Sequence, residues 1–410
     1  MERVVITGLG AISALGIGAD HNFAQALAGV SGIDYLNLSF TRQIPGCVAA
    51  QIRYPLPDLV KKSELSLFDR FALMGWIAAH EAVQQSGINQ ESGQLDQSGV
   101  FWGTGMGGAT TLENGYIDLF IEGKNRLRPL SIIASMNNSP AGQIALRCGF
   151  GGTVNTYSSA CVSSAQAIGE AYRHIRHGYA NRILAGGSEA LLTFGIVTAW
   201  EAMKVLATAD PSRPAEASQP FAANRSGLVL GEAAAAVMLE SLSSAQARGA
   251  TILAELVGYG ASNDATHMSN PNPAGQARAM DMAIAGSGLT PTQIDYINAH
   301  GAGTAAGDAT ETESIKRVFG AHAQRLMVSS TKSMHGHTLG AAAALEFVLT
   351  VQALRNKAVP PTAFLRQPDP ACDLDYVPLH GRRDQQIRAA MSNSFAFGGS
   401  NVALIVKDFV

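Results

Sequence analysis

The chain has 410 residues, of which 47% are hydrophobic and only 15% are charged. Because disorder requires low hydrophobicity and high charge, this composition excludes a disordered protein and favours two or three domains with a large core. A formal net charge of −3 argues against nucleic-acid binding, which normally needs a basic excess. The cysteines lie far apart without a CxxC pair, which excludes a disulfide scaffold and a thiolate zinc site; they are Cys47, Cys148, Cys161 and Cys372.

Two apolar stretches resemble membrane or export segments, and neither fits. Residues 4–19 lack a positively charged start and contain several glycines that weaken a helix. Residues 338–354 contain Glu346 and stop at Arg355, which is short of the roughly 20 apolar residues that a span requires. We therefore predict a cytoplasmic protein that does not associate with membranes.

Predicted strands and helices alternate along the chain. Apolar, β-branched runs that end in small residues occur at residues 4–10, 99–105, 182–187 and 235–240, and again at 253–260, 294–300, 326–331 and 402–407. Ala-rich helical patterns follow many of these runs, which predicts an α/β protein whose sheets are covered by helices. The glycines in G8-L-G10 lack the third glycine of a dinucleotide fingerprint, so we interpret them as a turn at the end of a strand.

The two series of strands indicate an internal duplication. Residues 154–177 contain a strand, a turn of small residues and an amphipathic helix, and residues 326–345 repeat that order. Residues 100–108 similarly parallel residues 296–304. We predict an N-terminal half over residues 1–250 and a C-terminal half over residues 251–410. The Pro-rich stretch 210–220 is predicted to be a surface loop.

Cys161 lies at a predicted junction between a strand and a helix, among small residues that leave its sulfur approachable. The N-terminus of a helix stabilises a thiolate through its dipole and its free N–H groups. These features favour a nucleophilic cysteine. The alternative is an inert buried cysteine, which is the more common situation.

Two histidines follow predicted strands of the C-terminal half. His300 opens the turn N298-A-H-G-A-G-T, and His337 lies in K332-S-M-H-G-H-T-L-G. Both histidines could meet Cys161 at one site, although either could instead be a hydrogen-bonded structural residue. His335 and His337 lack the ligand spacing of known zinc sites, and we predict no metal.

Lys332 could be a surface lysine, but it stands beside three hydroxyl residues, which suggests a partly buried charge that needs a carboxylate partner. Asp308, Glu311 and Glu346 are the candidate partners.

Four motifs occur in order along the chain: S159-A-C-V-S-S-A, N298-A-H-G-A-G-T, S330-T-K-S-M-H-G-H-T-L-G-A-A and N393-S-F-A-F-G-G-S-N. Together they resemble the motifs of the β-ketoacyl-acyl-carrier-protein synthases of types I and II. The resemblance covers nearly the whole chain. It implies a thiolase fold, in which two duplicated halves form a five-layered α-β-α-β-α sandwich. It also implies an acyltransferase without a cofactor that extends an acyl thioester by decarboxylative condensation with malonyl-carrier protein.

The resemblance assigns roles to individual residues. Cys161 matches the nucleophile, and His300 and His337 match the pair that promotes decarboxylation. Lys332 matches the lysine that organises the site, with Glu311 and Glu346 as its partners and Asp308 in a supporting position.

Further positions concern the substrate. The backbone N–H groups of Cys161 and Phe395 match the oxyanion hole, and Phe395 also matches the gate to the acyl pocket. Met106 matches a residue that limits chain length, and we expect Thr304 and Phe397 to contact substrate.

Several residues depart from the family pattern. Ala302 removes a hydroxyl that would contact pantetheine, and Ala396 replaces a glycine in the gate loop, where positive φ would strain it. His335 and Ala222 replace a hydroxyl residue and an aspartate. These changes favour a specialised synthase, for example one that makes a polyene or aryl-polyene chain.

The expected partners are acyl- and malonyl-loaded carrier protein and a second chain, either identical or a related chain-length subunit. One basic group on this chain could either dock an acidic carrier protein or form an ordinary solvated face: Lys61, Lys62, Lys124, Arg126 and Arg128.

Other function classes fit less well. An inactive chain-length partner normally lacks the cysteine, and a degradative thiolase has a second catalytic cysteine near the C-terminus, where N393-S-F-A-F-G-G-S-N contains none. A cysteine hydrolase would not depend on malonyl substrates. A carrier-binding module would form no thioester on Cys161.

Overall fold

The computed structural model describes residues 1–38, 40, 43–88 and 95–409. Counted over these residues, its large mixed sheet has eleven strands: two sets of five, and the short β2 (Gly16–Ile17), which pairs with β1. The first set comprises β1 (Val4–Ser13), β5 (Ser98–Gly103), β6 (Val154–Tyr157), β7 (Arg182–Glu189) and β9 (Ala233–Ser241). The second comprises β10 (Ala254–Asn263), β11 (Tyr296–Asn298), β12 (Met327–Ser329), β13 (Ala389–Phe395) and β14 (Ser400–Lys407).

Both sets have the same topology. Their spatial orders are β6-β5-β7-β9-β1 and β12-β11-β13-β14-β10. Numbered along the chain, the second strand of each set (β5 or β11) pairs in parallel with the third and the fourth. The fifth strand (β9 or β14) is antiparallel to the fourth and to the first. The sets join where the beginning of β1 pairs with β10. The predicted duplication is therefore confirmed, while the exact boundary at residue 250, between α8 (Leu242–Ala247) and β10, stays a prediction.

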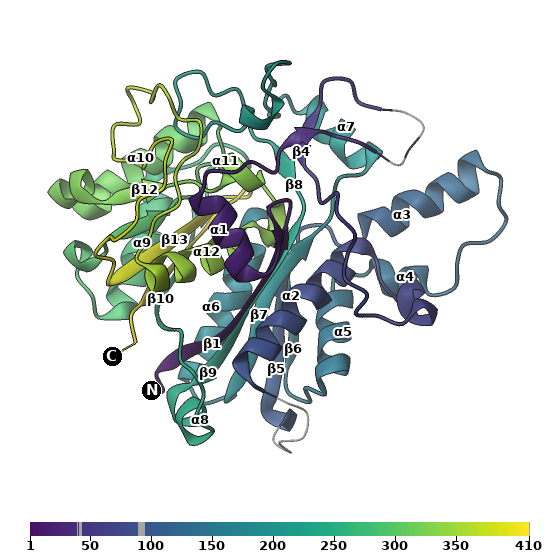
Figure 1. Ribbon diagram of the computed structural model, residues 1–410, viewed down its shortest axis with the longest axis horizontal. Helices are drawn as coiled ribbons and strands as arrows, with labels where there is room; N and C mark the ends of the chain where they lie inside the picture. The colour runs from purple at the N-terminus through teal and green to yellow at the C-terminus, as the bar shows by residue number, and fades with distance from the viewer. Residues whose placement is uncertain (39, 41–42, 89–94, 410) are drawn as a thin grey trace.

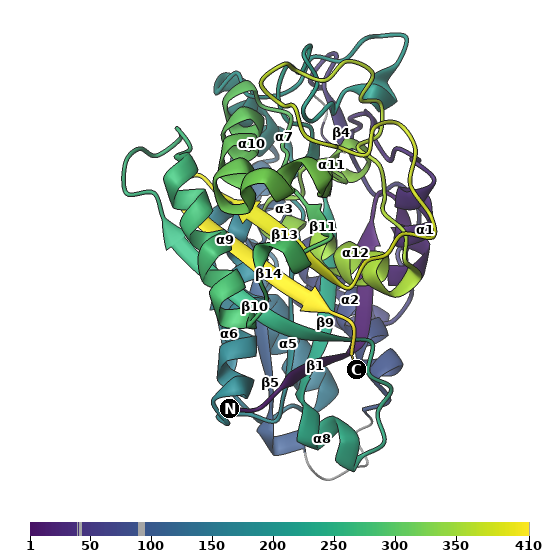
Figure 2. The same cartoon turned by 90° about the vertical axis from the view of Figure 1, so that its left-hand side faces the viewer.

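The helices form three layers around the two sets of strands (Figures 1 and 2). Outside the first set lie α2 (Arg70–Ser86) and α5 (Ser139–Cys148), and outside the second lie α9 (Pro273–Ser287) and, beside it, α10 (Ala305–Phe319). Between the sets lie α6 (Ser163–Arg176) and α12 (Ala342–Asn356). Every residue of α12 from Ala342 to Leu354 is buried. This is the predicted five-layered sandwich.

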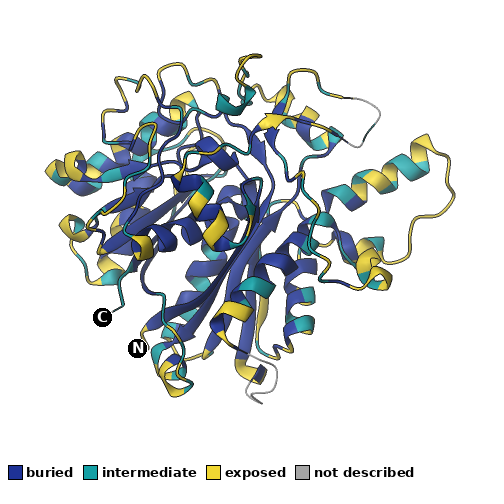
Figure 3. Cartoon of the chain, in the orientation of Figure 1, coloured by how far each residue is buried: buried dark blue, intermediate teal, exposed yellow. Residues whose placement is uncertain are grey.

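Strand alternation divides the core among these layers. In β5, Phe101 packs toward α6 and the central layer, whereas Val100 and Trp102 pack against α2 and α5. Successive side chains of a strand point to opposite faces, and both faces of β5 are covered by helices, so its large side chains, Val100 to Trp102, are all apolar. Figure 3 shows the strands and central helices as the buried part of the molecule.

Two strand predictions needed correction. β1 does not end at G8-L-G10 but continues to Ser13, because the glycines allow α2 to approach. A Cβ at Gly10 would lie 1.9 Å from the carbonyl oxygen of Ala78, and one at Gly8 would lie 2.0 Å from that of Ala82. β13 was not predicted, since its sequence of small and polar residues, AAMSNSF, lacks the usual strand signal.

Smaller elements surround the site end of the sandwich. They are α1 (Ala19–Leu27), α3 (Ala109–Tyr116), α4 (Ser131–Ser135), α7 (Phe194–Ala202), α11 (Lys332–His335), β2 (Gly16–Ile17), and a small sheet of β3 (Asp34–Tyr35), β4 (Val48–Ala50) and β8 (Leu230–Gly231). α3 projects from the body in Figure 1. The predicted loop 210–220 contains one short 3-10 turn, Pro214–Glu216. Within the described residues, no helix has the length and hydrophobicity needed to cross a membrane.

Candidate active site

Cys161 occupies the short 3-10 turn Ala160–Val162, between β6 and the beginning of α6. Ala160 has a φ of 52°, a strained conformation of the kind that clusters at functional sites. The thiol is buried. Burial raises its pKa to about 12, although Lys332 and the backbone N–H groups of Cys161 and Phe397 act in the opposite direction. The expected lowering by the helix is thus outweighed by burial, and the resting group is a thiol.

His337 reaches Cys161 from the other half of the molecule. Its Nε2 lies 3.1 Å from Sγ of Cys161. Its backbone is held by β8, because the His337 N–H donates to the Val229 carbonyl at 2.6 Å and its carbonyl accepts from Gly231. The Leu339 N–H donates to Nδ1 at 3.1 Å, so the proton of the neutral ring is on Nε2. Burial, Lys332 and His335 hold the His337 pKa well below its usual value.

His300 follows β11 and faces His337, with 5.3 Å between the ring centroids and an angle of 81° between the rings. Its Nδ1 lies 3.5 Å from the Lys332 ammonium, which can only donate, so Nε2 carries the proton. Burial, then Lys332 and His337, hold the His300 pKa well below its usual value. Both rings are therefore neutral and present an Nε2–H donor.

Lys332 opens α11 and is almost completely buried. Its ammonium contacts Oε1 of Glu346 at 2.5 Å and donates to the His300 carbonyl at 2.6 Å. Burial raises the pKa of Glu346 to about 7, while Lys332 lowers it. This pair fixes a positive charge beside both histidines and so favours their neutral form.

The structure corrects the two other carboxylates proposed for Lys332. Glu311 accepts instead from the N–H groups of His300 and Gly301, at 2.9 and 2.8 Å. Asp308 accepts from the N–H groups of Phe221 and Gly303, at 2.8 and 3.1 Å. Both lie on α10, directly after the turn 300–304, so they bind that turn rather than the lysine. Glu346 alone forms an ion pair with Lys332 within the described chain.

The structure also corrects one of the two residues predicted to form the oxyanion hole. The N–H that faces the Cys161 thiol from the C-terminal motif belongs to Phe397 and not to Phe395. β13 ends at Phe395, and residues 396–399 form the hairpin before β14, so the tip of this hairpin carries the N–H over the sulfur. The Phe395 ring is buried 6.0 Å from the His300 ring, measured between centroids.

Ala396 does not strain this hairpin, because the positive φ values fall on Gly398 and Gly399. The predicted stiffening through a strained alanine is therefore wrong.

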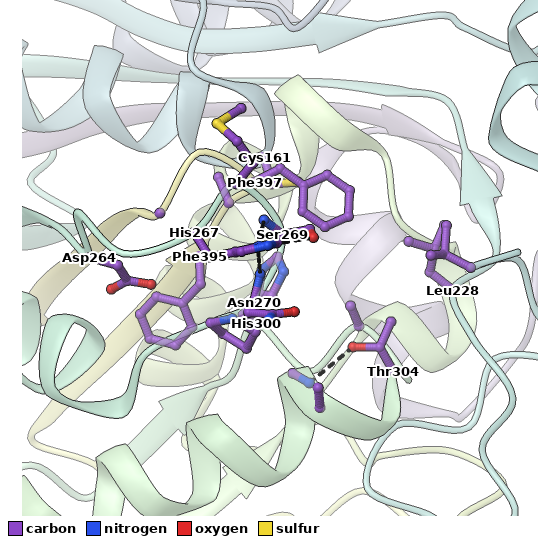
Figure 4. A pocket seen from close by; sticks show the side chains of 18 of the residues that line it. Cys161, Leu228, Asp264, His267, Ser269, Asn270, His300, Thr304, Phe395 and Phe397 are labelled. Atoms are coloured by element: carbon purple, nitrogen blue, oxygen red, sulfur yellow. Dashed lines mark hydrogen bonds between the residues drawn. The ribbon is translucent and has the colours of Figure 1, made fainter. Parts of the chain in front are cut away.

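A cavity of about 370 Å³ opens onto Cys161, His300 and His337 (Figure 4). One part of its wall is largely apolar and is formed by Trp200, Met203, Val205, Leu228, Ala302 and Phe397. Another is polar and is formed by Asp264, His267, Ser269, Asn270, Thr304 and Asn401. In Figure 4, Leu228 and Thr304 lie across the cavity from Asp264.

Most of this wall was not predicted. The loop after β10 provides Asp264 to Asn270, and its one sequence signal is a polar run between a strand and a helix. Thr304 and Phe397, the residues predicted to contact substrate, both line the cavity, and the Phe397 ring stacks on Trp200 with 6.0 Å between centroids. Met106 is not among the lining residues and is 51% exposed, so its predicted contact with substrate is not seen in the single chain.

His335 has a structural setting. Its Nε2 lies 2.9 Å from the Thr331 hydroxyl and its Nδ1 lies 2.8 Å from the Gly336 carbonyl. Burial lowers its pKa to about 3. Because both ring nitrogens are engaged, the arrangement does not favour the zinc alternative for His335 and His337.

Comparison with known proteins agrees with this geometry. The model of the β-ketoacyl synthase N-terminal domain matches residues 1–245, and that of the C-terminal domain matches residues 253–366. The chain is 42% identical to nodulation protein E of Rhizobium sp. (strain N33) over 406 residues, which cover 99% of both proteins. It is 38% identical to 3-oxoacyl-[acyl-carrier-protein] synthase 2 of Staphylococcus aureus (strain COL) over 411 residues, covering 100% of this chain and 99% of that protein.

Solved structures show the same likeness over whole chains. A β-ketoacyl synthase from Burkholderia phymatum STM815 matches with a TM-score of 0.92 and 34% identity, covering 100% of both chains. A type II polyketide ketosynthase solved in complex with its acyl carrier protein matches with a TM-score of 0.91 and 30% identity, also covering 100% of both chains. The chain therefore belongs to the β-ketoacyl synthase family of condensing acyltransferases.

Proposed function

We propose that this chain holds an acyl group as a thioester on Cys161 and condenses it with a malonyl unit on acyl carrier protein, which lengthens the chain by two carbons. The observation that carries this proposal is the meeting of Cys161, His300 and His337 at one cavity, with 3.1 Å between Sγ of Cys161 and Nε2 of His337. A nucleophile from one half of the molecule thus faces two neutral donors from the other.

Acyl transfer uses the N-terminal half and the hairpin tip. Sγ of Cys161 attacks the carbonyl carbon of the acyl-carrier thioester. The bond between that carbon and the carrier sulfur then breaks, and the carrier thiol leaves with the proton that Cys161 gave up. The N–H groups of Cys161 and Phe397, which face the sulfur in the resting site, bind the negative oxygen of the tetrahedral intermediate. Preorganised donors of this kind supply a large share of the catalysis in acyl transfer.

Decarboxylation uses the two histidines. The bond between the carboxyl group and the α-carbon of the malonyl unit breaks, CO₂ leaves, and the electron pair moves to the thioester as an enolate. The Nε2–H groups of His300 and His337 donate to the enolate oxygen. Lys332 supports this role, because its positive charge keeps both rings neutral and its ammonium group lies against Nδ1 of His300.

Condensation completes the cycle. The enolate carbon attacks the carbonyl carbon of the Cys161 thioester, the C–S bond breaks, and the sulfur takes up a proton from solvent to regenerate the thiol. The apolar wall around Trp200 and Phe397 suits an acyl chain, while the polar wall around Asn270 and Thr304 suits the amides of a carrier arm. Ala302 lies in the apolar part of the wall and offers no hydroxyl to the carrier arm, which supports a specialised substrate over a housekeeping one.

We expect a second chain to cover part of the protein surface around α3. Large apolar side chains are exposed in and around the α3 projection: Leu112, Tyr116, Phe120, Ile121, Leu127, Leu130, Ile132, Ile133 and Met136. Large exposed apolar patches normally mark interfaces. Similar proteins include an ishigamide ketosynthase/chain length factor, with a TM-score of 0.90 and 30% identity. We therefore keep the alternative of a ketosynthase subunit that works with a chain-length partner.

The carrier protein is the other expected partner. Among the proposed basic residues, Lys124 is paired with Asp118 and Glu122 at 2.7 Å each, which weakens its part in docking. We also propose that the enzyme acts in the cytoplasm, where Cys161 would remain a thiol.

The test is incubation of the purified chain with an acyl donor, carrier protein and malonyl-carrier protein, followed by mass analysis of the carrier-bound product. We expect a β-ketoacyl product two carbons longer than the primer, and none from the Cys161→Ala variant. A product that is free acid would indicate a hydrolase and contradict the proposal. Product formed only after a related chain is added would favour the chain-length alternative.

A further inference from the structure

A buried carboxylate outside the proposed catalytic set lies behind the site. Glu189 is the last residue of β7 and is completely buried. Its Oε1 accepts from the Thr104 hydroxyl at 3.0 Å and the Met106 N–H at 3.3 Å. Its Oε2 accepts from the N–H groups of Gly105 at 2.5 Å and Gly340 at 3.0 Å. No ion pair involves Glu189 in the part of the chain that the structure describes, so these neutral donors hold it.

The carboxylate joins the two halves of the molecule. Gly105 follows β5 of the first half, whereas Gly340 lies in the 3-10 turn Leu339–Ala341, just before α12 of the second half. The two glycines touch, since a Cβ at Gly340 would lie 2.3 Å from the Gly105 nitrogen and 2.4 Å from Oε2 of Glu189. Oε2 of Glu189 therefore binds one turn from each half, at the place where the two turns are in contact.

The turn that Glu189 binds also sets the proton position on His337. Leu339, the residue before Gly340, donates its N–H to Nδ1 of His337 at 3.1 Å. Leu339 has a φ of 49°, a left-handed conformation that a leucine keeps only when its surroundings enforce it. Glu189 supplies such a constraint through the next N–H along the chain.

We infer that Glu189 is a positioning residue for His337. By holding Gly340, it keeps the Leu339 N–H on Nδ1 and thereby keeps the His337 proton on Nε2, facing the reacting atoms. The inference rests on the proposed function, because it concerns the donor that stabilises the enolate. Burial raises the pKa of Glu189 to about 7. Keeping this side chain ionised in its buried position therefore lowers the stability of the fold.

Removal of this carboxylate should affect one half-reaction more than the other. Acylation depends on Cys161 and the N–H groups beside it, whereas decarboxylation depends on the orientation of the His337 ring. In Glu189→Ala, we expect CO₂ release from malonyl-carrier protein to fall by about 10²-fold, a typical cost of misplacing a reacting group by about 1 Å. Acylation of Cys161 should change by less than about 10-fold.

Two conservative variants separate positioning from folding. In Glu189→Gln, the amide oxygen can accept from Gly105 and Gly340 while its NH₂ donates to the Thr104 hydroxyl, which can reverse its role. Of the four hydrogen bonds to Glu189, only the longest, from the Met106 N–H at 3.3 Å, is then lost. This variant should recover most of the CO₂ release. Combining Glu189→Gln with Thr104→Val removes that acceptor and should abolish the recovery, whereas Thr104→Val alone should have a small effect.

Glu240 offers a matched control. It is also a completely buried carboxylate, on the neighbouring strand β9, and it binds Arg182, Arg248 and Thr7 away from the site. Glu240→Gln should lower the midpoint of urea unfolding without changing the ratio of CO₂ release to acylation. A Glu189→Ala variant that lowers both half-reactions equally, as general damage would, overturns the inference.

The tautomer of His337 provides a readout that does not depend on activity. In ¹⁵N-histidine-labelled protein, with His337→Ala used to assign the signal, the wild-type ring should show the Nε2–H tautomer. Glu189→Ala should shift this signal toward a tautomer mixture, and an unchanged signal overturns the inference. If the wild type itself releases no CO₂ from malonyl-carrier protein, the proposed function fails instead, and the two failures are thereby distinguished.

Discussion

The separation of the two half-reactions can be tested by removing either histidine. His300 and His337 each present one Nε2–H donor to the cavity, and neither supplies the backbone N–H groups that face the Cys161 thiol, which belong to Cys161 and Phe397. Loss of one preorganised donor typically costs about 10²–10³ in rate, or roughly 3–4 kcal/mol of transition-state stabilisation. We therefore expect His300→Ala and His337→Ala each to lose about this factor in CO₂ release from malonyl-carrier protein.

Acylation should survive both substitutions. His337 contacts Sγ at 3.1 Å, so His337→Ala should acylate more slowly than His300→Ala, while both still acquire an acyl group on Cys161. The assay combines the intact-protein mass after exposure to acyl-carrier protein with the release of labelled CO₂. Cys161→Ala is the reciprocal control, because it should form no acyl-enzyme and still release some CO₂. Decarboxylation at the wild-type rate in both histidine variants would refute this division of roles.

Three further predictions concern the pocket, the pH dependence and the fold. Although Met106 is half-exposed in the single chain, the resemblance to the family still predicts that Met106→Gly accepts longer primers and Met106→Trp shorter ones; identical primer profiles by product mass would exclude it from the acyl pocket. Burial raises the pKa of Glu311 to about 7, above its value in the unfolded chain. The free energy of unfolding of the wild type relative to Glu311→Gln should therefore fall by up to about 3 kcal/mol as the pH rises from about 4.5 to 7. A difference in urea unfolding that does not change with pH would contradict this. Gly10→Ala should destabilise the fold by about 1–3 kcal/mol, since its Cβ would meet the Ala78 carbonyl, whereas Gly286→Ala, which meets nothing within 4 Å, should be neutral or stabilising.

The repeated arrangement of strands and helices was predictable because each unit carries its own local signal. The runs before Cys161 and His337 both end in small residues and lead into helices, and their matching positions in the two halves indicated the duplication. β13 escaped prediction because its small and polar residues are buried by tertiary packing and not by their own hydrophobicity. The continuation of β1 through Gly8 and Gly10 likewise depends on how closely α2 packs.

Motif positions indicated which side chains could meet, but not which atoms do so. The N–H that faces Cys161 comes from Phe397. This depends on the course of the main chain at the hairpin tip after β13, which the residue types alone do not reveal. The partner of Lys332 could not be chosen among three acids by spacing alone. Glu346 lies on the buried helix α12, whereas Glu311 on α10 is already used by two N–H groups of the turn after β11.

The cavity wall was the least predictable part of the site. It gathers segments around residues 200–205, 228 and 264–271 that carry no motif and meet only when the two halves pack together. Glu189 is a similar case, because its importance lies in two N–H groups from distant turns. A single acid at the end of an apolar strand gives no sign of either contact.

The most direct test of the proposed chemistry is the mass of the peptide containing Cys161, before and after malonyl-carrier protein is added to the acylated enzyme. We expect the Cys161 peptide to carry the acyl group as a thioester after exposure to acyl-carrier protein. Addition of malonyl-carrier protein should remove that group while equal amounts of CO₂ and β-ketoacyl-carrier product appear. An acyl group on another residue, or one that persists on Cys161 while product accumulates, would contradict the mechanism.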